Sequence, residues 1–354
     1  MQISLAVVGG LVLAGVVAHS AWSSHRNLPK QATPEAPAPE QELAPAQSGE
    51  GAAAERLEPS LDVDSGLASL ASLATMNASD RKPGLDVLID AVAPVVIEGM
   101  VSGEAALAAM PSTRRAGSKP FGVEGLSVIT GEWEFPTAGH RYSAFQCGVQ
   151  LANRTGALNQ IEYSEFVMKT QAFADAVGGE PEFPEMLDEV ARARELDQFA
   201  SGHDAQLSFT LRAVNTAWSP GYVHQSAARL GFVPGSIPGR MVLPASQQGQ
   251  APILGLAFDT QAAMAEDPEQ TALRELTLSL DVPQVSRSEQ PFARMCEAAL
   301  SLAANMDGVI IDDNGNLIRP EAMEVIHADL EQLYDTLDSR DLSAGSVLGR
   351  RLFS

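Results

Sequence analysis

The chain has 354 residues, a formal net charge of −22 and two cysteines. This acidic balance argues against nucleic acid, and against the anionic inner leaflet, as the main partner. Cys147 and Cys296 lie far apart in apolar segments, which favours two buried thiols over a disulfide in a reducing compartment.

The N-terminus contains a long apolar run. Ile3 to Trp22 carries no formal charge, and about twenty residues in a helix span the roughly 30 Å of a bilayer core. Arg26 and Lys30 follow the run and no Lys or Arg precedes it, so the positive-inside rule places the N-terminus outside and the rest in the cytoplasm. A cleaved signal peptide is the alternative, but a basic n-region is missing. We therefore predict residues 1–26 as a transmembrane anchor that begins near Ile3 and ends near Trp22.

Residues 27–84 differ in composition from the rest of the chain. Prolines recur among Ala, Glu, Gln and Ser, and no aromatic residue is present. Such a segment buries too little apolar surface to offset the entropy of ordering, so we predict a disordered linker. Its mean reach as a coil is about 40 Å.

The pattern of apolar residues and turn signals predicts a first α+β module over residues 85–202. We expect strands over residues 86–96, 120–125 and 142–151, and helices over residues 102–110, 163–177 and 183–199. Ser102 is a helix-capping residue, and Gly178 followed by Gly179 ends the second helix.

A second module follows over residues 203–343, with residues 344–354 as a tail. We expect strands over residues 206–214, 240–243, 253–258, 275–282, 309–311 and 317–319, and helices over residues 221–230, 291–306 and 320–337. Asn314 and Gly315 predict a two-residue type I′ turn between the last two strands.

The order of elements is similar in the two modules. Each begins with a strand and a short helix and continues with a long strand, an Ala-rich helix that ends near a glycine, and a Leu-rich helix. This order predicts a mostly antiparallel sheet with helices on one face, of the split β-α-β type. Two unrelated segments of similar pattern remain the alternative to a duplication.

Three segments near the C-terminus carry a resemblance to a known family. Leu276 to Pro283 is a strand that ends in Val-Pro, an Ala-rich helix over residues 292–305 runs into Gly308-Val309 and Asp312-Asp313, and Pro320 begins a closing helix. Together with the anchor and the linker, the chain resembles ZipA-type cell-division proteins over about residues 206–340. The first module has no matching motif.

The resemblance implies a fold, a partner and a location. The family has an N-out membrane helix, a linker, and a C-terminal domain that binds the C-terminal tail of FtsZ, the tubulin-like division GTPase. We therefore expect an adaptor that tethers FtsZ polymers to the bacterial inner membrane at the division site.

In the family, the tail binds the face of the sheet that the helices leave uncovered. Strand alternation in this chain places Leu207, Phe209, Leu211, Leu276, Leu278 and Leu280 under the helices. The candidate partner-binding residues then lie on the opposite face: Ser208, Thr210, Arg212, Gly255, Ala257, Thr277, Ser279 and Asp281. These side chains are small and polar, whereas the family groove is apolar. A shift of one residue in register would exchange the two faces.

Signatures of enzyme chemistry are weak. The six histidines share no metal-ligand spacing, and no phosphate-binding loop is present. A calcium loop around Asp312 fails because Ile310 occupies its first ligand position. We therefore expect no cofactor, metal, small-molecule substrate or catalytic residue. Arg114, Arg115 and Lys119 form a basic cluster, which is either a solvated turn or an anion site.

A second function stays open at this point. The alternative is a membrane-anchored enzyme or chaperone-like binding protein whose site lies in the first module. A deep pocket with converging polar groups would favour that alternative, and an open sheet face would favour the adaptor.

Overall fold

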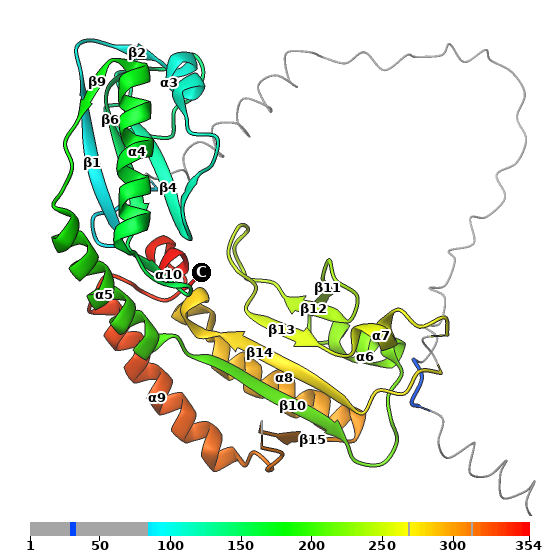
Figure 1. Cartoon of the computed structure of the whole chain (residues 1–354). Coiled ribbons are helices and arrows are strands. Elements are labelled where there is room, and N and C mark those ends of the chain that lie inside the picture. The colour runs from blue at the N-terminus through cyan, green and yellow to red at the C-terminus, as the bar shows by residue number, and fades with distance from the viewer. Residues whose placement is uncertain (1–28, 33–83, 268–269, 313) are drawn as a thin grey trace, which may run out of the picture. The chain divides into compact units, whose positions relative to one another are not determined.

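The computed structural model describes residues 29–32, 84–267, 270–312 and 314–354. The predicted anchor, with Ile3 and Trp22, lies outside these residues, as does most of the predicted linker. Across the described ranges, no helix combines the length and the apolar character that a membrane span requires. The chain divides into two compact units, one up to Phe199 and one from Ala200 that also includes residues 29–32 (Figure 1).

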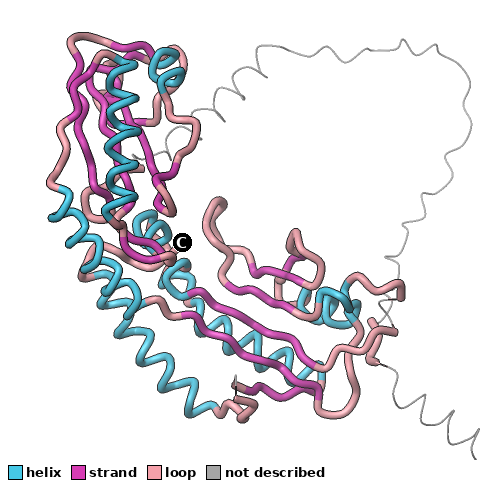
Figure 2. The backbone as a smooth tube through the Cα atoms, viewed as in Figure 1, coloured by secondary structure: helices cyan, strands magenta, loops and turns pink. Residues whose placement is uncertain are grey.

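The first unit is an antiparallel sheet with helix α4 along one face (Figures 1 and 2). Its strands are β1 (Asp90–Ile97), β2 (Val101–Ser102), β3 (Arg115–Ala116), β4 (Lys119–Ser127), β5 (Trp133–Glu134), β6 (Arg141–Gln150), β7 (Ala152–Asn153), β8 (Gly156–Ala157) and β9 (Gly179–Pro181). Its helices are α3 (Gly103–Ala109), α4 (Gln160–Val177) and α5 (Met186–His203). The strand order is β3-β4-β6-β1-β9, and β7 pairs with β8 apart from this sheet.

Local signals explain where these helices begin and end. The Ser102 hydroxyl accepts a hydrogen bond from the Ala105 amide at 3.2 Å, which confirms it as the cap of α3. Asn159 and Glu162 form a reciprocal capping box at the start of α4. Gly178 ends α4 with φ +66°, a left-handed conformation that favours glycine. Between α4 and the sheet, the ring of Phe173 from α4 meets that of Phe145 from β6 in edge-to-face contact in the core.

The second unit is also an antiparallel sheet with helices on one side. Its strands are β10 (Gln206–Ala213), β11 (Val233–Pro234), β12 (Arg240–Leu243), β13 (Leu254–Ala257), β14 (Glu275–Asp281) and β15 (Gly308–Ile311). Its helices are α6 (Pro220–Ala228), α7 (Thr260–Ala263), α8 (Pro291–Met306), α9 (Pro320–Asp338) and α10 (Val347–Leu352), with 3₁₀ turns at Val282–Gln284 and Arg287–Glu289. The strand order is β11-β12-β13-β14-β10-β15. Helix α8 packs on β14, β10 and β15, and α9 packs on α8.

The two units share one topology. The order β4-β6-β1-β9 in the first corresponds to β13-β14-β10-β15 in the second, and all of these pairs are antiparallel. The registers also agree. Ile97 pairs with Gly179 and Ala213 pairs with Gly308, and in each unit that glycine directly follows a left-handed residue that ends the preceding helix. Helices α3, α4 and α5 occupy the same positions in the chain order of the first unit as α6, α8 and α9 do in the second.

Residues 29–32 were expected to belong to the disordered linker, and the structure instead places them against the second unit. The Lys30 amide donates to the Ala217 carbonyl at 2.7 Å, and the Ser219 amide donates to the Lys30 carbonyl at 2.8 Å. The Lys30 ammonium donates to the Met306 carbonyl at 2.9 Å, at the C-terminal end of α8. This ordering has a physical cause, because the last carbonyls of a helix lack intrahelical partners and favour a cation.

The turn after β15 differs from the predicted type I′ hairpin. The Asp312 amide donates to the Asn316 carbonyl at 2.9 Å, the Gly315 amide donates to the Asp312 carbonyl at 2.9 Å, and Gly315 has φ +82°. The Asp312 carboxylate accepts hydrogen bonds from the backbone amides of Asn314 and Asn316. These hydrogen bonds lower the pKa of Asp312. Beyond the loop, Leu317 makes a single bridge to Ile311 in place of the strand predicted over residues 317–319.

The C-terminal residues, which were expected to form a tail, are folded. Ser346 caps α10 through a hydrogen bond from the Gly349 amide at 3.0 Å. Leu352 and Phe353 are buried, and the Gln284 side-chain amide donates to the Phe353 carbonyl at 2.7 Å. The apolar pair Leu352 and Phe353 supplies the buried surface that orders this segment.

Candidate functional site

The second unit has one face covered by helices and one that they leave free (Figure 1). Leu276, Leu278 and Leu280 of β14 are at most 1% exposed, and they point toward α8. The predicted alternation therefore holds on β14, and the register shift that would exchange the faces has not occurred. The opposite face, which we call the second-module face, carries all the predicted partner-binding residues: Ser208, Thr210, Arg212, Gly255, Ala257, Thr277, Ser279 and Asp281.

Cross-strand pairing arranges these residues in rows. One row runs across β15, β10, β14, β13 and β12 as Ile311, Thr210, Thr277, Ala257 and Arg240. The next row runs across β10, β14, β13, β12 and β11 as Ser208, Ser279, Gly255, Val242 and Val233. The predicted residues from β10, β13 and β14 are therefore direct neighbours in the middle of the sheet.

The centre of the second-module face consists of small, uncharged residues. A Cβ atom added to Gly255 would lie 2.6 Å from the Ser279 hydroxyl oxygen, so the glycine leaves room for that side chain. Ser279 itself is exposed, and Thr277 and Ala257 are half-buried. A flat surface with hydroxyl groups and no central charge suits an extended peptide that offers both polar and small apolar groups.

Charged residues lie toward the ends of the strands. Arg212 forms an ion pair with Glu275 across β10 and β14, with 2.6 Å between Nε and Oε1. Both side chains are about half exposed, at 48% and 50%, so the pair adds little stability. The Arg212 guanidinium is therefore already paired with Glu275 when a partner approaches this face. Asp281 lies at the other end of β14, opposite Gln206.

Sequence reasoning missed the apolar members of this face. Val242 and Val233 extend the Ser279 row at one edge, whereas Ile311, which begins the Thr277 row at the other, is only 3% exposed. Val242 alternates with buried Met241 in a strand that was predicted, so its face was available from the sequence. The cross-strand neighbours of Val242 could not be predicted from the sequence, because the pairing of β11, β12 and β13 does not follow from the pattern of any single strand. The face is therefore less uniformly polar than predicted.

The basic cluster of the first module is part of the fold. Lys119 is 1% exposed, and its ammonium donates to Asn153 Oδ1 at 2.6 Å and to Thr155 Oγ1 at 3.2 Å. Burial lowers the pKa of Lys119. The Arg114 guanidinium lies 4.5 Å from the centre of the Phe135 ring. Neither predicted reading, a solvated turn or an anion site, describes Lys119, whose hydrogen bonds hold the turn between β7 and β8.

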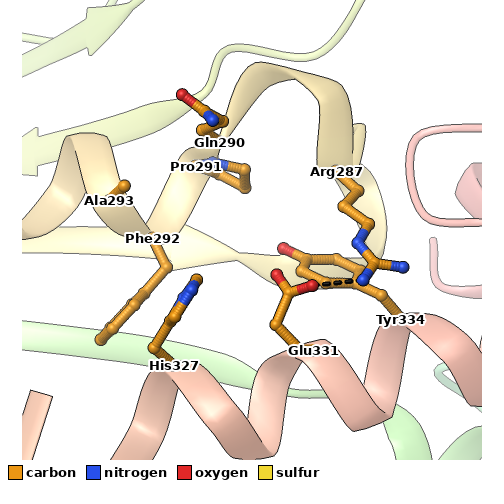
Figure 3. A pocket seen from close by; sticks show the side chains of 8 residues that line it. All are labelled: Arg287, Gln290, Pro291, Phe292, Ala293, His327, Glu331 and Tyr334. Atoms are coloured by element: carbon orange, nitrogen blue, oxygen red, sulfur yellow. Dashed lines mark hydrogen bonds and ion pairs between the residues drawn. The ribbon is translucent and has the colours of Figure 1, made fainter. Parts of the chain in front are cut away.

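A cavity of about 350 Å³ lies where the start of α8 meets α9, in the second unit (Figure 3). It is lined by Arg287, Gln290, Pro291, Phe292, Ala293, His327, Glu331 and Tyr334. Arg287 is paired with Glu331 and with Asp335, and the rings of Phe292 and His327 stack with 6.2 Å between their centres. Burial raises the pKa of Tyr334 to about 12. The cavity therefore presents Arg287 already engaged by acidic residues of α9. It also lies outside the first module, where the alternative function places its site.

Comparison with known proteins gives one match. The family described as ZipA, C-terminal FtsZ-binding domain, matches residues 259–329. The matched segment contains β14, α8 and β15 and the first part of α9, whereas β10, α6, β12 and β13 precede it. No curated protein matches the chain.

The matched segment supplies both the strand at the centre of the second-module face and the helix that covers the other face. The family match therefore confirms, over residues 259–329, the resemblance to ZipA-type proteins that was read from the sequence.

Proposed function

We propose that the second module binds the C-terminal tail of FtsZ across the second-module face, and that the chain tethers FtsZ polymers to the inner membrane through its predicted anchor. The observation that carries the proposal is the family match over residues 259–329. Of the predicted partner-binding residues, Thr277, Ser279 and Asp281 lie within the match.

The geometry of the face supports an extended peptide as the ligand. Thr210, Thr277 and Ser279 offer hydroxyl groups along neighbouring strands, and Val242 with Val233 offers an apolar edge. The tail is partly basic in the family picture, and a chain with a formal net charge of −22 attracts such a segment over a distance.

A small face of this kind gives a weak single contact. An FtsZ polymer presents many identical tails, and a membrane holds many copies of the adaptor in two dimensions. When several tails bind several adaptors at once, the overall avidity rises by about 10²–10⁴, although no individual contact becomes stronger. Weak individual binding is therefore compatible with firm attachment of a polymer.

The decisive variant is Ala257→Arg. Ala257 lies in the middle of the Thr277 row, so a long cationic side chain there blocks the face and repels a basic tail. We expect the affinity for a fluorescently labelled FtsZ tail peptide to fall at least about tenfold, which corresponds to 1.4 kcal/mol, in an anisotropy titration of the full chain.

The matched control is Val325→Arg. Val325 is 61% exposed on α9, in the same unit but away from the second-module face, so the same change of charge should leave binding unaltered. Both variants should keep the circular dichroism of the wild type. The site assignment is wrong if Ala257→Arg binds like the control, and the binding function itself is wrong if the wild type does not bind.

The tethering part of the proposal needs a separate test. The full chain in liposomes should carry FtsZ polymers to the top of a density gradient, and liposomes with the Ala257→Arg variant should leave them at the bottom. Polymers that float with liposomes alone, or that stay behind with the wild type, would contradict tethering.

A further inference from the structure

The shared topology allows the two modules to be compared residue by residue. Val92 precedes Ile97 by the same distance along β1 as Ser208 precedes Ala213 along β10, and Ile97 and Ala213 occupy equivalent pairs. Val92 pairs with Gly148 and Ser208 pairs with Ser279, so Gly148 is the counterpart of Ser279 on the helix-free face. By the same pairing, Gly122 corresponds to Gly255, Gln146 to Thr277 and Glu124 to Ala257. We call the surface around Gly122, Gly148 and Glu124 the first-module face.

The first-module face is occupied by the chain itself. A Cβ atom added to Gly148 would lie 2.5 Å from Leu85 Cδ2, and one added to Gly122 would lie 3.3 Å from the same atom. The Leu85 side chain therefore lies directly over both glycines. Gly148 is buried as a result, whereas its counterpart Ser279 is exposed.

The backbone of the same segment is held as well. One oxygen of the Glu124 carboxylate accepts hydrogen bonds from the amides of Gly84 and of Leu85, the latter at 3.0 Å. The other oxygen accepts a hydrogen bond from the Gln146 side-chain amide at 2.8 Å. Glu124 is only 4% exposed. A carboxylate this buried needs hydrogen-bond donors, and residues 84 and 85 supply two of them.

This set of contacts is the kind by which a protein recognises an extended peptide. An acceptor holds consecutive backbone amides, and a depression formed by residues without side chains takes one aliphatic side chain. The turn that follows the segment has hydrogen bonds of its own, because the Asp86 carbonyl accepts hydrogen bonds from the amides of Ile89 and Asp90. Gly84 and Leu85 can therefore leave the face without breaking the turn that begins at Asp86.

We propose that the first-module face is a second peptide-binding face and that Gly84 and Leu85 are its tethered ligand. A partner enters only in exchange for this segment, and it must offer an extended backbone with two consecutive amides and an aliphatic side chain such as leucine. The proposed function concerns the second module, so this inference extends beyond it and does not depend on it.

The test uses the full chain and a capped synthetic peptide with the sequence of residues 81–87. In the Leu85→Ser variant the tethered side chain is lost, and the peptide should produce saturable shifts of the Gly122 and Gly148 amide signals in nuclear magnetic resonance spectra. The wild type should show no shift at these signals at the same peptide concentration. A peptide with serine in place of leucine should produce no shift in either protein.

The matched control is Leu88→Ser. Leu88 is 38% exposed and lies outside the tethered ligand, so this variant should exclude the peptide as the wild type does. The proposal is overturned if Leu85→Ser folds but its Gly148 signal ignores the peptide, or if shifts occur only at Gly255 and Ser279. A Leu85→Ser variant that does not fold overturns it too, because a tethered ligand is dispensable for the fold.

Hydrogen exchange on the wild type gives an independent measurement. The Leu85 amide should exchange by local opening at least about tenfold faster than the amides of β6, in keeping with the range of local opening free energies in native proteins. Equal protection of Leu85 and β6 would mean that the segment opens only with the whole unit, and the proposal would fall.

Discussion

Replacing Leu278 with alanine tests the assignment of the two faces of the second sheet. Leu278 is fully buried in the middle of β14, where it pairs with Phe209 and Leu256 and faces α8. A buried Leu→Ala change loses about 2–5 kcal/mol, because the apolar contacts are lost and a cavity remains. For a unit of this size, each kcal/mol shifts Tm by about 2–4 °C, so we expect a fall of roughly 10 °C.

The neighbouring residue provides the matched control. Ser279 follows Leu278 on the same strand but points to the opposite, exposed face. Ser279→Ala should change stability by no more than about 0.5 kcal/mol. Both variants are compared with the wild type by thermal unfolding followed by circular dichroism. A larger loss for Ser279→Ala than for Leu278→Ala would mean that the faces are exchanged, and the proposed tail-binding surface would then be wrong.

Other predictions concern the anchor, the thiols and a helix cap. Without residues 1–26 the chain should stay in the supernatant in a membrane sedimentation assay, and pelleting in moderate salt would contradict a single anchor. Burial raises the pKa of Cys147 to about 12 and of Cys296 to about 11, so both thiols should react with Ellman's reagent at pH 8 far more slowly in the native chain than in urea. Cys147 should be the slower, and fast native labelling of Cys147 would refute its burial. Burial raises the pKa of Glu162, but hydrogen bonds from Ser118 and from the helix cap outweigh burial and leave it below its ordinary value. Its stabilisation is therefore present above an unfolded pKa of about 4.3 and is lost as the pH falls through the lower folded value. Glu162→Gln should lower the Tm of the first unit more at pH 7 than at pH 3, and an equal loss at both values would contradict this account.

Elements with strong local signals were predicted closely. Helix α8 runs from Pro291 to Met306 and β12 from Arg240 to Leu243, both as predicted. A proline at the first helical position and a helix-breaking glycine after the last turn mark α8 in the sequence. The strands that were missed, such as β5, β7 and β8, have two residues each. Two residues show no alternation, so only tertiary pairing defines such strands.

The candidate site was predictable in part for the same reason. Alternation along β10 and β14 assigned each residue to a face without knowledge of the partner strand. The rows across the sheet depend on the order of β11, β12 and β13, which is a long-range property. Strand β9 illustrates this limit. Its sequence Gly179-Glu180-Pro181 has no β-branched residue, and yet it takes the place that Gly308–Ile311 takes in the second unit.

The comparison of the two modules shows one topology with two different helix-free faces. Strand order and register define the topology, and these are preserved in both modules while the residues on the helix-free faces diverge. Where the second-module face has Ala257, the first-module face has the buried carboxylate of Glu124, and where the second has Ser279 the first has Gly148. A carboxylate that binds backbone amides and a depression over two glycines select one peptide segment tightly. A flat face of hydroxyl groups and small side chains suits a ligand that binds weakly and dissociates readily. Under the two proposals made above, the same scaffold supports two ligand chemistries, with the first module fitted to its own chain and the second open to a partner.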